Sequence, residues 1–194
     1  MAKRTSRVKI LSSETKYTGR VFGVRRDELI EPTGVRVVRE IVTHHGSVVV
    51  LPVFDDGRIL LIRQYRYAAG QFMWELVAGH REPAEDFRRG AARELQEETG
   101  YTARRYRKLL EIYPSPGLLS ERMVIFLAEG LTKGEARPED DEKIEARILT
   151  LREAERWIHS GKIRDAKTIS GLLYYAAFAR RQRKRKPSNS AQSL

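Results

Sequence analysis

Residues 79–101 constrain the fold of this chain more than any other part of its sequence, because their second half reads as a helix with an acidic face. The carboxylates of Glu94, Glu97 and Glu98 fall at positions i, i+3 and i+4, so they share one face of the predicted helix. Like charges at this spacing repel by about 0.2–0.5 kcal/mol per pair. Oxygen ligands on one face suit a hard divalent cation such as Mg²⁺ or Mn²⁺. The stretch therefore predicts a helix that carries a metal ion on its acidic face.

A longer pattern around these glutamates decides between a metal site and an ordinary solvated surface. The pattern is G-x5-E-x7-R-E-U-x-E-E-x-G-U, in which U is a bulky apolar residue. Its positions are filled by Gly79, Glu85, Arg93, Glu94, Leu95, Glu97, Glu98, Gly100 and Tyr101. Because most positions demand one residue type, a chance match is on the order of 10⁻⁸ to 10⁻⁹ per starting point. The stretch resembles the Nudix box, which implies hydrolysis of a nucleoside diphosphate linked to another group.

The resemblance to the Nudix box also implies which residues bind the cation. Glu94 and Glu98 would be direct ligands, and Glu97 would assist catalysis, often as a ligand through water. The carbonyl of Ala78, just before the first glycine of the box, would complete the shell of Mg²⁺ or Mn²⁺. Arg93 would hold the acidic loop or its i+4 neighbour Glu97 in place.

Three segments outside the box resemble the ADP-ribose pyrophosphatase group of this family. They are R-Q-Y-R at 63–66, Y-P-S-P-G-L-L-S-E-R at 113–122 and G-K-I-R-D-A-K-T at 161–168. The resemblance implies that water splits ADP-ribose into AMP and ribose 5-phosphate. Hydrolases of GDP-mannose and other nucleoside diphosphate sugars share much of these segments, so such a substrate is the main alternative.

The same resemblance assigns substrate contacts to five residues. Arg66 would grip the diphosphate through bidentate hydrogen bonds, which suit a guanidinium group. Glu121 would contact the nucleoside or the terminal ribose. Arg39 and Glu40 would reach into the site of a partner subunit in a homodimer. Trp74 would stack on adenine, although an aromatic residue in an apolar run is at least as often part of the core.

The resemblance to the ADP-ribose pyrophosphatase group implies that an acid on the loop before the final strand of the domain activates water or binds an extra metal. The candidates on this loop are Glu139, Asp140, Asp141 and Glu142. Their spacing to the next strand favours Glu142 as the group that activates water. His80 lies at a variable position of the box and is expected to face solvent.

The net charge of +11 raises the alternative of a nucleic-acid partner. Residues 1–10 carry four basic and no acidic side chains, and residues 180–194 carry six basic and no acidic ones, which leaves +1 between 11 and 179. A nearly neutral core favours a small-molecule substrate over an RNA cap or 5′ end. An inactive binding module is a third alternative, but such a protein has no need to keep three mutually repelling glutamates.

The composition also limits where the chain works. It contains no cysteine, which excludes disulfides and zinc–thiolate sites and fits a reducing cytoplasm. Residues 1–15 contain no apolar segment typical of a secretion signal, and the apolar run at 48–54 is too short to cross a membrane. We therefore expect a cytoplasmic protein without a membrane partner.

Hydrophobic periodicity predicts an α/β protein in three parts. Alternating strands at 17–24 and 35–43 predict a small antiparallel sheet in an N-terminal extension, 1–45, which packs on its own domain or forms a dimer interface. The hydrolase domain, 46–179, is expected to be a Nudix-type α/β/α sandwich with a mixed sheet. The remaining residues, 180–194, read as a basic disordered tail.

Overall fold

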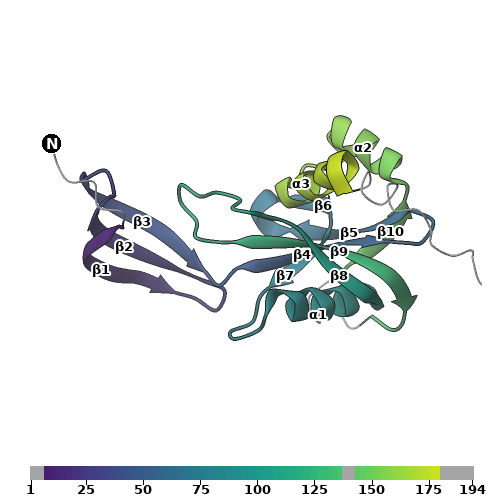
Figure 1. Cartoon of the computed structure of the whole chain (residues 1–194), viewed down its shortest axis with the longest axis horizontal. Coiled ribbons are helices and arrows are strands. Elements are labelled where there is room, and N and C mark those ends of the chain that lie inside the picture. The colour runs from purple at the N-terminus through teal and green to yellow at the C-terminus, as the bar shows by residue number, and fades with distance from the viewer. Residues whose placement is uncertain (1–6, 137–142, 180–194) are drawn as a thin grey trace, which may run out of the picture.

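The computed structural model describes residues 7–136 and 143–179, which form two bodies lying end to end (Figure 1). A three-stranded sheet forms the N-terminal body, and a layered α/β body follows it. The tail at 180–194 and the acidic residues 139–142, with the predicted base Glu142, lie outside the described residues. No helix in the described ranges has the length and hydrophobicity that crossing a bilayer requires.

The N-terminal sheet has three antiparallel strands, in the order β1 (Lys9–Thr18), β2 (Phe22–Ile30) and β3 (Arg36–His44). The single strand predicted at 17–24 is wrong, because the chain turns between β1 and β2, where the amide of Gly19 donates to the carbonyl of Phe22 (2.9 Å). Polar residues fill most of β1 and all of it is exposed, so hydrophobic periodicity could not reveal this edge strand.

The end of β3 ties the two bodies together. The amide of Val42 donates to the carbonyl of Leu118, and the amide of Ser120 donates to the carbonyl of Val42, each at 2.9 Å. Gly46 then turns the chain with a φ of 96°, a left-handed conformation that favours glycine. The residues between Val42 and Gly46 are therefore held between the N-terminal sheet and the loop at 113–122.

The larger body is built on a seven-stranded sheet. Its mixed strand directions confirm the mixed sheet that was predicted. Its strands are β4 (Ser47–Val53), β5 (Ile59–Arg66), β6 (Gln71–Glu75), β7 (Val77–His80), β8 (Tyr101–Ile112), β9 (Met123–Lys133) and β10 (Glu145–Leu149). The main order is β10-β5-β4-β9-β8, while β6 pairs with β5 and β7 with β4. Strand β4 runs parallel to β9 and antiparallel to β5 and β7. A short 3₁₀ helix, Tyr67–Ala69, joins β5 to β6.

Helices cover both faces of this sheet (Figure 1). Helix α1 (Phe87–Thr99) lies on one face, and α2 (Leu151–His159) and α3 (Ala166–Tyr174) lie on the other. A π-helical turn, Tyr175–Ala179, continues α3. The layers confirm the predicted α/β/α sandwich with a small antiparallel sheet in front of it.

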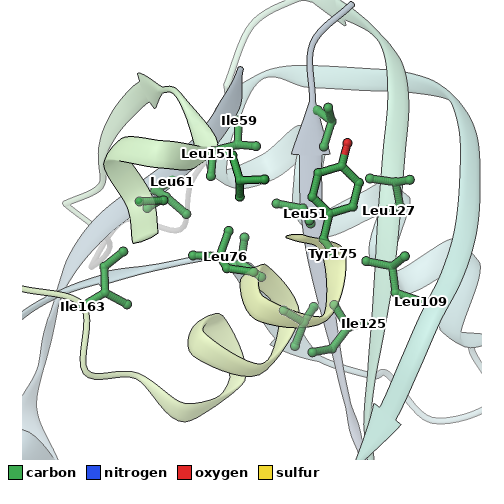
Figure 2. Close-up of a cluster of buried hydrophobic side chains, with 14 of the residues drawn as sticks. Leu51, Ile59, Leu61, Leu76, Leu109, Ile125, Leu127, Leu151, Ile163 and Tyr175 are labelled. Carbon is green, nitrogen blue, oxygen red and sulfur yellow. The ribbon is translucent and has the colours of Figure 1, made fainter. Parts of the chain in front are cut away.

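Two apolar cores fill the spaces between these layers. The core beneath α2 and α3 includes Leu51, Ile59, Leu61, Ile163 and Tyr175 (Figure 2). The core beneath α1 includes Val48, Val50, Leu60, Ile62 and Leu95. Because successive residues of a strand point to opposite faces, a shift of one position moves a side chain from one core to the other. This alternation decides which predicted site residues can meet α1.

Candidate active site

Helix α1 is capped at both ends by residues within the Nudix box stretch. The side chain of Asp86 caps the first turn by accepting hydrogen bonds from the amides of Arg88 (2.9 Å) and Arg89 (3.0 Å). Gly100 closes the helix in a left-handed conformation with a φ of 73°. The three glutamates of the acidic face therefore lie in the second half of the helix, toward the negative end of its dipole. That position adds to their repulsion and increases the benefit of a nearby cation.

The end of β7 packs directly against the carboxylates of α1. Any side chain added at Gly79 would overlap the carboxylate of Glu94, so only glycine leaves room for it. One step earlier, the amide of Ala78 donates to a carboxylate oxygen of Glu98 (3.3 Å). Glu94 and Glu98 are both buried, with 9% and 5% of their surface exposed. The fold thus brings the predicted metal ligands Ala78, Glu94 and Glu98 to one place.

Arg93 links the acidic residues of the box to one another. Its Nη1 donates to Glu94 (2.7 Å) and Glu97 (2.8 Å), its Nε donates to Glu85 (3.2 Å), and its Nη2 donates to the backbone oxygen of His80 (3.0 Å). We call Arg93, Glu85, Glu94 and Glu97 the acidic cluster; its formal charge is −2. Arg93 thus holds both Glu97 and the loop that precedes the helix, as expected from the resemblance.

The ionisation of this cluster follows from its contacts. Burial alone would lower the pKa of Arg93, but hydrogen bonds to Glu85 and Glu97 and the charge of Glu94 raise it above the ordinary value for arginine. Burial would raise the pKa of the Glu85 carboxyl, but the hydrogen bond from Arg93 holds it below its usual range. Both members of the pair therefore stay charged at neutral pH.

The acidic side chains are bonded to Arg93 rather than converged around a common point. Within residues 7–136 and 143–179, no three His, Cys, Asp or Glu side chains form a group that could hold a metal ion as they stand. The predicted ligands therefore lie near one another, but their oxygens do not point to one shared position in this conformation. Hydrogen bonds to Arg93 turn Glu94 and Glu97 toward the guanidinium group in this conformation.

A second group of charges surrounds Arg66 on the other side of the site. The Nε and Nη2 of Arg66 donate to the two oxygens of Glu75, each at 2.8 Å. Lys167 donates to the same carboxylate and to Asp165 (2.9 Å). We call these four residues the paired cluster; its formal charge is zero. Because Glu75 occupies the Nε edge of Arg66, the Nη1 edge is the one available to grip a diphosphate.

Glu75 and Lys167 were not predicted from the sequence, although a signal for Glu75 existed. Glu75 interrupts the apolar run between Trp74 and Ala78, and a charge in a buried strand needs a partner. Its side chain is 1% exposed. Burial would raise the pKa of Glu75, but Arg66 and Lys167 hold it below the usual range. Lys167 carries no comparable signal, because its partner lies 92 residues away in the sequence.

A cleft of about 370 Å³ is lined by residues from both clusters. It is lined by Arg20, Val21, His44, His45, Arg66, Ala78, Gly79, His80, Arg81, Glu82, Pro83, Arg93, Glu94 and Glu97. The predicted residues Arg66, Ala78, Glu94 and Glu97 are therefore brought together. Arg20 and Val21 come from the turn between β1 and β2, so the N-terminal sheet contributes to this wall. Nothing in the sequence predicted that contribution.

Trp74 lies outside the cleft. It is 7% exposed and packs in the core beneath α2 and α3, with its ring 5.2 Å from that of Trp157. Glu75 follows it in the strand and turns to the opposite side, toward Arg66. This position favours the core role over stacking on adenine.

Glu121 lies behind the cleft rather than on its wall. It is 8% exposed and accepts a hydrogen bond from the hydroxyl of Ser47, and its carboxylate lies 3.8 Å from Nδ1 of His44. Arg39 and Glu40 lie on exposed β3, and Arg39 pairs with Glu31 at 2.6 Å. Neither lines the cleft of its own chain. Their role in a partner's site stays a prediction.

Two histidines meet at the wall of the cleft. Nε2 of His44 lies 3.2 Å from Nδ1 of His80, and the amide of Gly46 donates to Nδ1 of His44 (2.9 Å). Burial and the nearby ring of His44 lower the pKa of His80. The expectation that His80 simply faces solvent is therefore incomplete, because its ring is exposed and also bonded. His44 was missed because its partner lies 36 residues away.

Comparison with known proteins shows which family the chain resembles. The model of the NUDIX domain matches residues 43–171. The ADP-ribose pyrophosphatase of Bacillus subtilis (strain 168) is 37% identical over 168 residues, covering 86% of this chain and 91% of that protein. A GDP-mannose pyrophosphatase of Yersinia pestis (strain Pestoides F) is 34% identical over 174 residues, covering 83% and 82%. The crystal structure of an ADP compounds hydrolase superposes with a TM-score of 0.80 at 26% identity, covering 93% and 98%.

The matched domain takes in β4, the whole Nudix box and α2, and it extends into α3. The box residues stand together around α1, as a box of this kind requires. Most of the chain also aligns with relatives above 30% identity. The chain therefore belongs to the Nudix hydrolase family.

Proposed function

We propose that this Nudix hydrolase is a divalent-metal-dependent pyrophosphatase that converts ADP-ribose to AMP and ribose 5-phosphate. One observation carries the proposal: Arg66 and the box glutamates Glu94 and Glu97 line one cleft, although they lie on different elements. A guanidinium group facing carboxylates is the arrangement that a metal-bound diphosphate needs. The choice of ADP-ribose is supported by the similarity to the Bacillus subtilis pyrophosphatase.

The chemistry of the donor set fits Mg²⁺ or Mn²⁺. All of the proposed donors are oxygens: the carboxylates of Glu94, Glu97 and Glu98 and the carbonyl of Ala78. The acidic cluster has a formal charge of −2, which a divalent cation would offset. Gly79 leaves space for the carboxylate of Glu94 beside the backbone at Ala78, where a Cβ atom would intrude. For these oxygens to converge, Glu94 and Glu97 must turn away from Arg93.

The reaction is an attack of water on a phosphorus atom of the diphosphate, with cleavage of the bridging P–O bond. A bound divalent cation would lower the pKa of water and neutralise charge on the phosphate oxygens. Arg66 would donate from its Nη1 edge to a non-bridging oxygen, oriented by its two bonds to Glu75. Glu142 is proposed to accept the proton from water, with Glu97 assisting.

A substrate panel tests the assignment. We expect kcat/KM with ADP-ribose and Mg²⁺ to exceed the value for GDP-mannose and other nucleoside diphosphate sugars by at least about tenfold. Mn²⁺ should support the same order of preference. An equal or higher value with GDP-mannose would replace ADP-ribose by the main alternative, which the similarity to the Yersinia pyrophosphatase supports.

The RNA alternative is tested by deleting the basic residues 180–194, which carry six of the positive charges. If RNA binding exists and depends on this tail, deletion should abolish it together with its steep salt dependence. Hydrolysis of ADP-ribose should stay within about twofold of the full chain. Turnover of capped RNA that exceeds turnover of ADP-ribose would contradict the proposal.

A homodimer formed through the N-terminal sheet is part of this proposal. Every residue of β1 is exposed, and the sheet leaves large apolar side chains in solvent: Ile10, Tyr17, Phe22 and Val38. Exposed apolar surface on a sheet with an unpaired edge is typical of an interaction surface. Arg39 and Glu40 lie on the same sheet, which is consistent with a role in the partner's site. Sedimentation at micromolar concentration should show a dimer; a monomer would refute this part.

A further inference from the structure

A chain of hydrogen bonds leads from the backbone at Gly46 to the cleft. The amide of Gly46 donates to Nδ1 of His44 at 2.9 Å, and Nε2 of His44 lies 3.2 Å from Nδ1 of His80. Each of these distances is within the normal range for hydrogen bonds that involve nitrogen. The direction of every donor in the chain follows from the first one, because a backbone amide can only donate.

The first donor decides the tautomer of both rings. Since Nδ1 of His44 accepts from Gly46, it carries no proton, and the proton of the neutral ring is on Nε2. That Nε2–H then donates to Nδ1 of His80, which must also be unprotonated. The remaining proton of the His80 ring is therefore on Nε2, on the side of the ring away from His44.

The backbone around both rings is held in place. The carbonyl of His80 accepts from Nη2 of Arg93 (3.0 Å), and His80 pairs with Ser47 in the ladder between β7 and β4. The amide of His44 donates to the hydroxyl of Ser120 (3.0 Å). Both histidines line the cleft that contains Arg66 and Glu94. A donor held in this way loses little conformational freedom when it binds a ligand.

We propose that His80 is a substrate-binding residue whose Nε2–H donates to an oxygen of the nucleoside diphosphate, and that His44 is a positioning residue that holds His80 in this tautomer. The proposal rests on the function proposed above, because it takes the occupant of the cleft to be a diphosphate. Acceptor oxygens are abundant in such a substrate, and a fixed N–H donor suits them.

Two substitutions at His80 test whether a donor at the position of Nε2 contacts the substrate. In His80→Asn, the side-chain oxygen can still accept from His44, but no donor reaches the position of Nε2. In His80→Gln, the longer amide restores a donor there. We expect His80→Asn to lower kcat/KM about 10- to 100-fold, mainly through KM, and His80→Gln to recover most of the loss. Normal activity in His80→Asn, or no recovery in His80→Gln, would overturn the substrate contact.

The tautomers of both histidines can be measured by NMR without an activity assay. Long-range ¹H–¹⁵N spectra of the ¹⁵N-labelled protein at about pH 8 should show the Nε2–H form for both His44 and His80. Addition of α,β-methylene-ADP with Mg²⁺ should shift Nε2 of His80, whereas exposed His159 on α2 should not change. In His44→Leu, the single tautomer of His80 should give way to a mixture. An Nδ1–H form of His80 in the wild type would contradict the chain of donors.

These experiments distinguish an error in the role of His80 from an error in the proposed function. If the wild type hydrolyses another diphosphate in preference to ADP-ribose, the substrate assignment fails, and the His80 variants are assayed on the preferred substrate instead. If the wild type hydrolyses ADP-ribose but the Nε2 signal of His80 does not shift when α,β-methylene-ADP is added, the proposed function stands and the proposed role of His80 is wrong. His159→Leu serves as the matched control, since it removes a histidine outside the cleft.

Discussion

Two charged clusters contribute side chains to the cleft, the paired cluster through Arg66 alone, and they differ in how their charges are matched. In the acidic cluster, the guanidinium group of Arg93 donates hydrogen bonds to three carboxylates, at distances of 2.7 to 3.2 Å. In the paired cluster, two cations and two carboxylates balance, and Glu75 at the centre is 1% exposed. Counted over its own four residues, the first therefore has a formal charge of −2, whereas the second has a formal charge of zero.

This difference indicates different tasks. Excess negative charge on a partly buried helix face is costly without a cation. Under the proposed function, the acidic cluster would therefore exchange bonds with Arg93 for bonds to a metal ion. The balanced cluster has nothing to gain from a further ion. Its contribution is to stabilise the fold and to keep one edge of Arg66 turned toward the cleft.

The largest effect is expected from the substitution Glu98→Gln on the acidic face. An amide oxygen can still accept from the backbone at Ala78, so the fold should persist, whereas the charge that a cation needs is lost. We expect kcat with ADP-ribose and Mg²⁺ to fall about a thousandfold, equivalent to about 4 kcal/mol. Glu155→Gln on α2 is the control. Near-normal turnover in Glu98→Gln would sink the assignment of the metal site.

Substitution of Gly79 by Ala tests the packing of the same wall. The added methyl group would overlap the carboxylate of Glu94, which must then move away from the backbone of β7. Because the obstacle is the end of a flexible side chain, we expect a stability loss of only about 1 kcal/mol but a loss of kcat/KM of roughly 100-fold. The control is Gly117→Ala, where a Cβ atom meets nothing within 4 Å. Equal activity in both variants would show that the position of Glu94 is unimportant.

Substitution of Lys167 by Met breaks the balance of the paired cluster. Glu75 would keep Arg66 but lose its second cation in a buried setting, at a cost of about 1–3 kcal/mol in the free energy of unfolding. Arg66 should become less well oriented, which raises KM about five- to tenfold while kcat stays within about threefold. Lys108→Met removes an exposed pair and should change neither quantity. A large fall in kcat alone would assign Lys167 to the chemical step instead.

The smallest effect concerns the pH dependence of stability. Because the folded protein lowers the pKa of Glu75, its ionised form stabilises the fold above the unfolded pKa of about 4.3, and this contribution is lost as the pH falls through the folded value. The difference in unfolding free energy between the wild type and Glu75→Gln should therefore shrink between neutral pH and about pH 3. Urea unfolding across this range measures it. A difference that grows in acid would mean that Glu75 is destabilising when ionised.

The outcome for particular residues shows what sequence patterns can reach. The acidic face of α1 was predictable because i, i+3 and i+4 positions of a helix are neighbours by local geometry alone. The order of layers was predictable because strand and helix periods differ. The turn that splits residues 17–24 was missed, because polar β1 has no apolar face for a periodicity to reveal.

The long-range pairings could not be predicted in the same way. Lys167 and Glu75 are separated by 92 residues, and His44 and His80 by 36, and neither pair leaves a local pattern. Trp74 and Glu75 are adjacent in sequence, yet one is buried beneath α2 and α3 while the other bonds Arg66. Only the register of the strand shows which of the two can contribute to the cleft.

The sequence by itself therefore determined the family, the layered fold and the acidic helix, because each depends on neighbours along the chain. The tertiary structure decided how charges on different elements are matched. It joined Arg93 to Glu85 in the loop before α1, balanced Arg66 with Glu75 and Lys167, and brought a histidine pair to the wall of the cleft. These arrangements join elements that come together only when the helical layers pack on the two faces of the sheet and close its two cores.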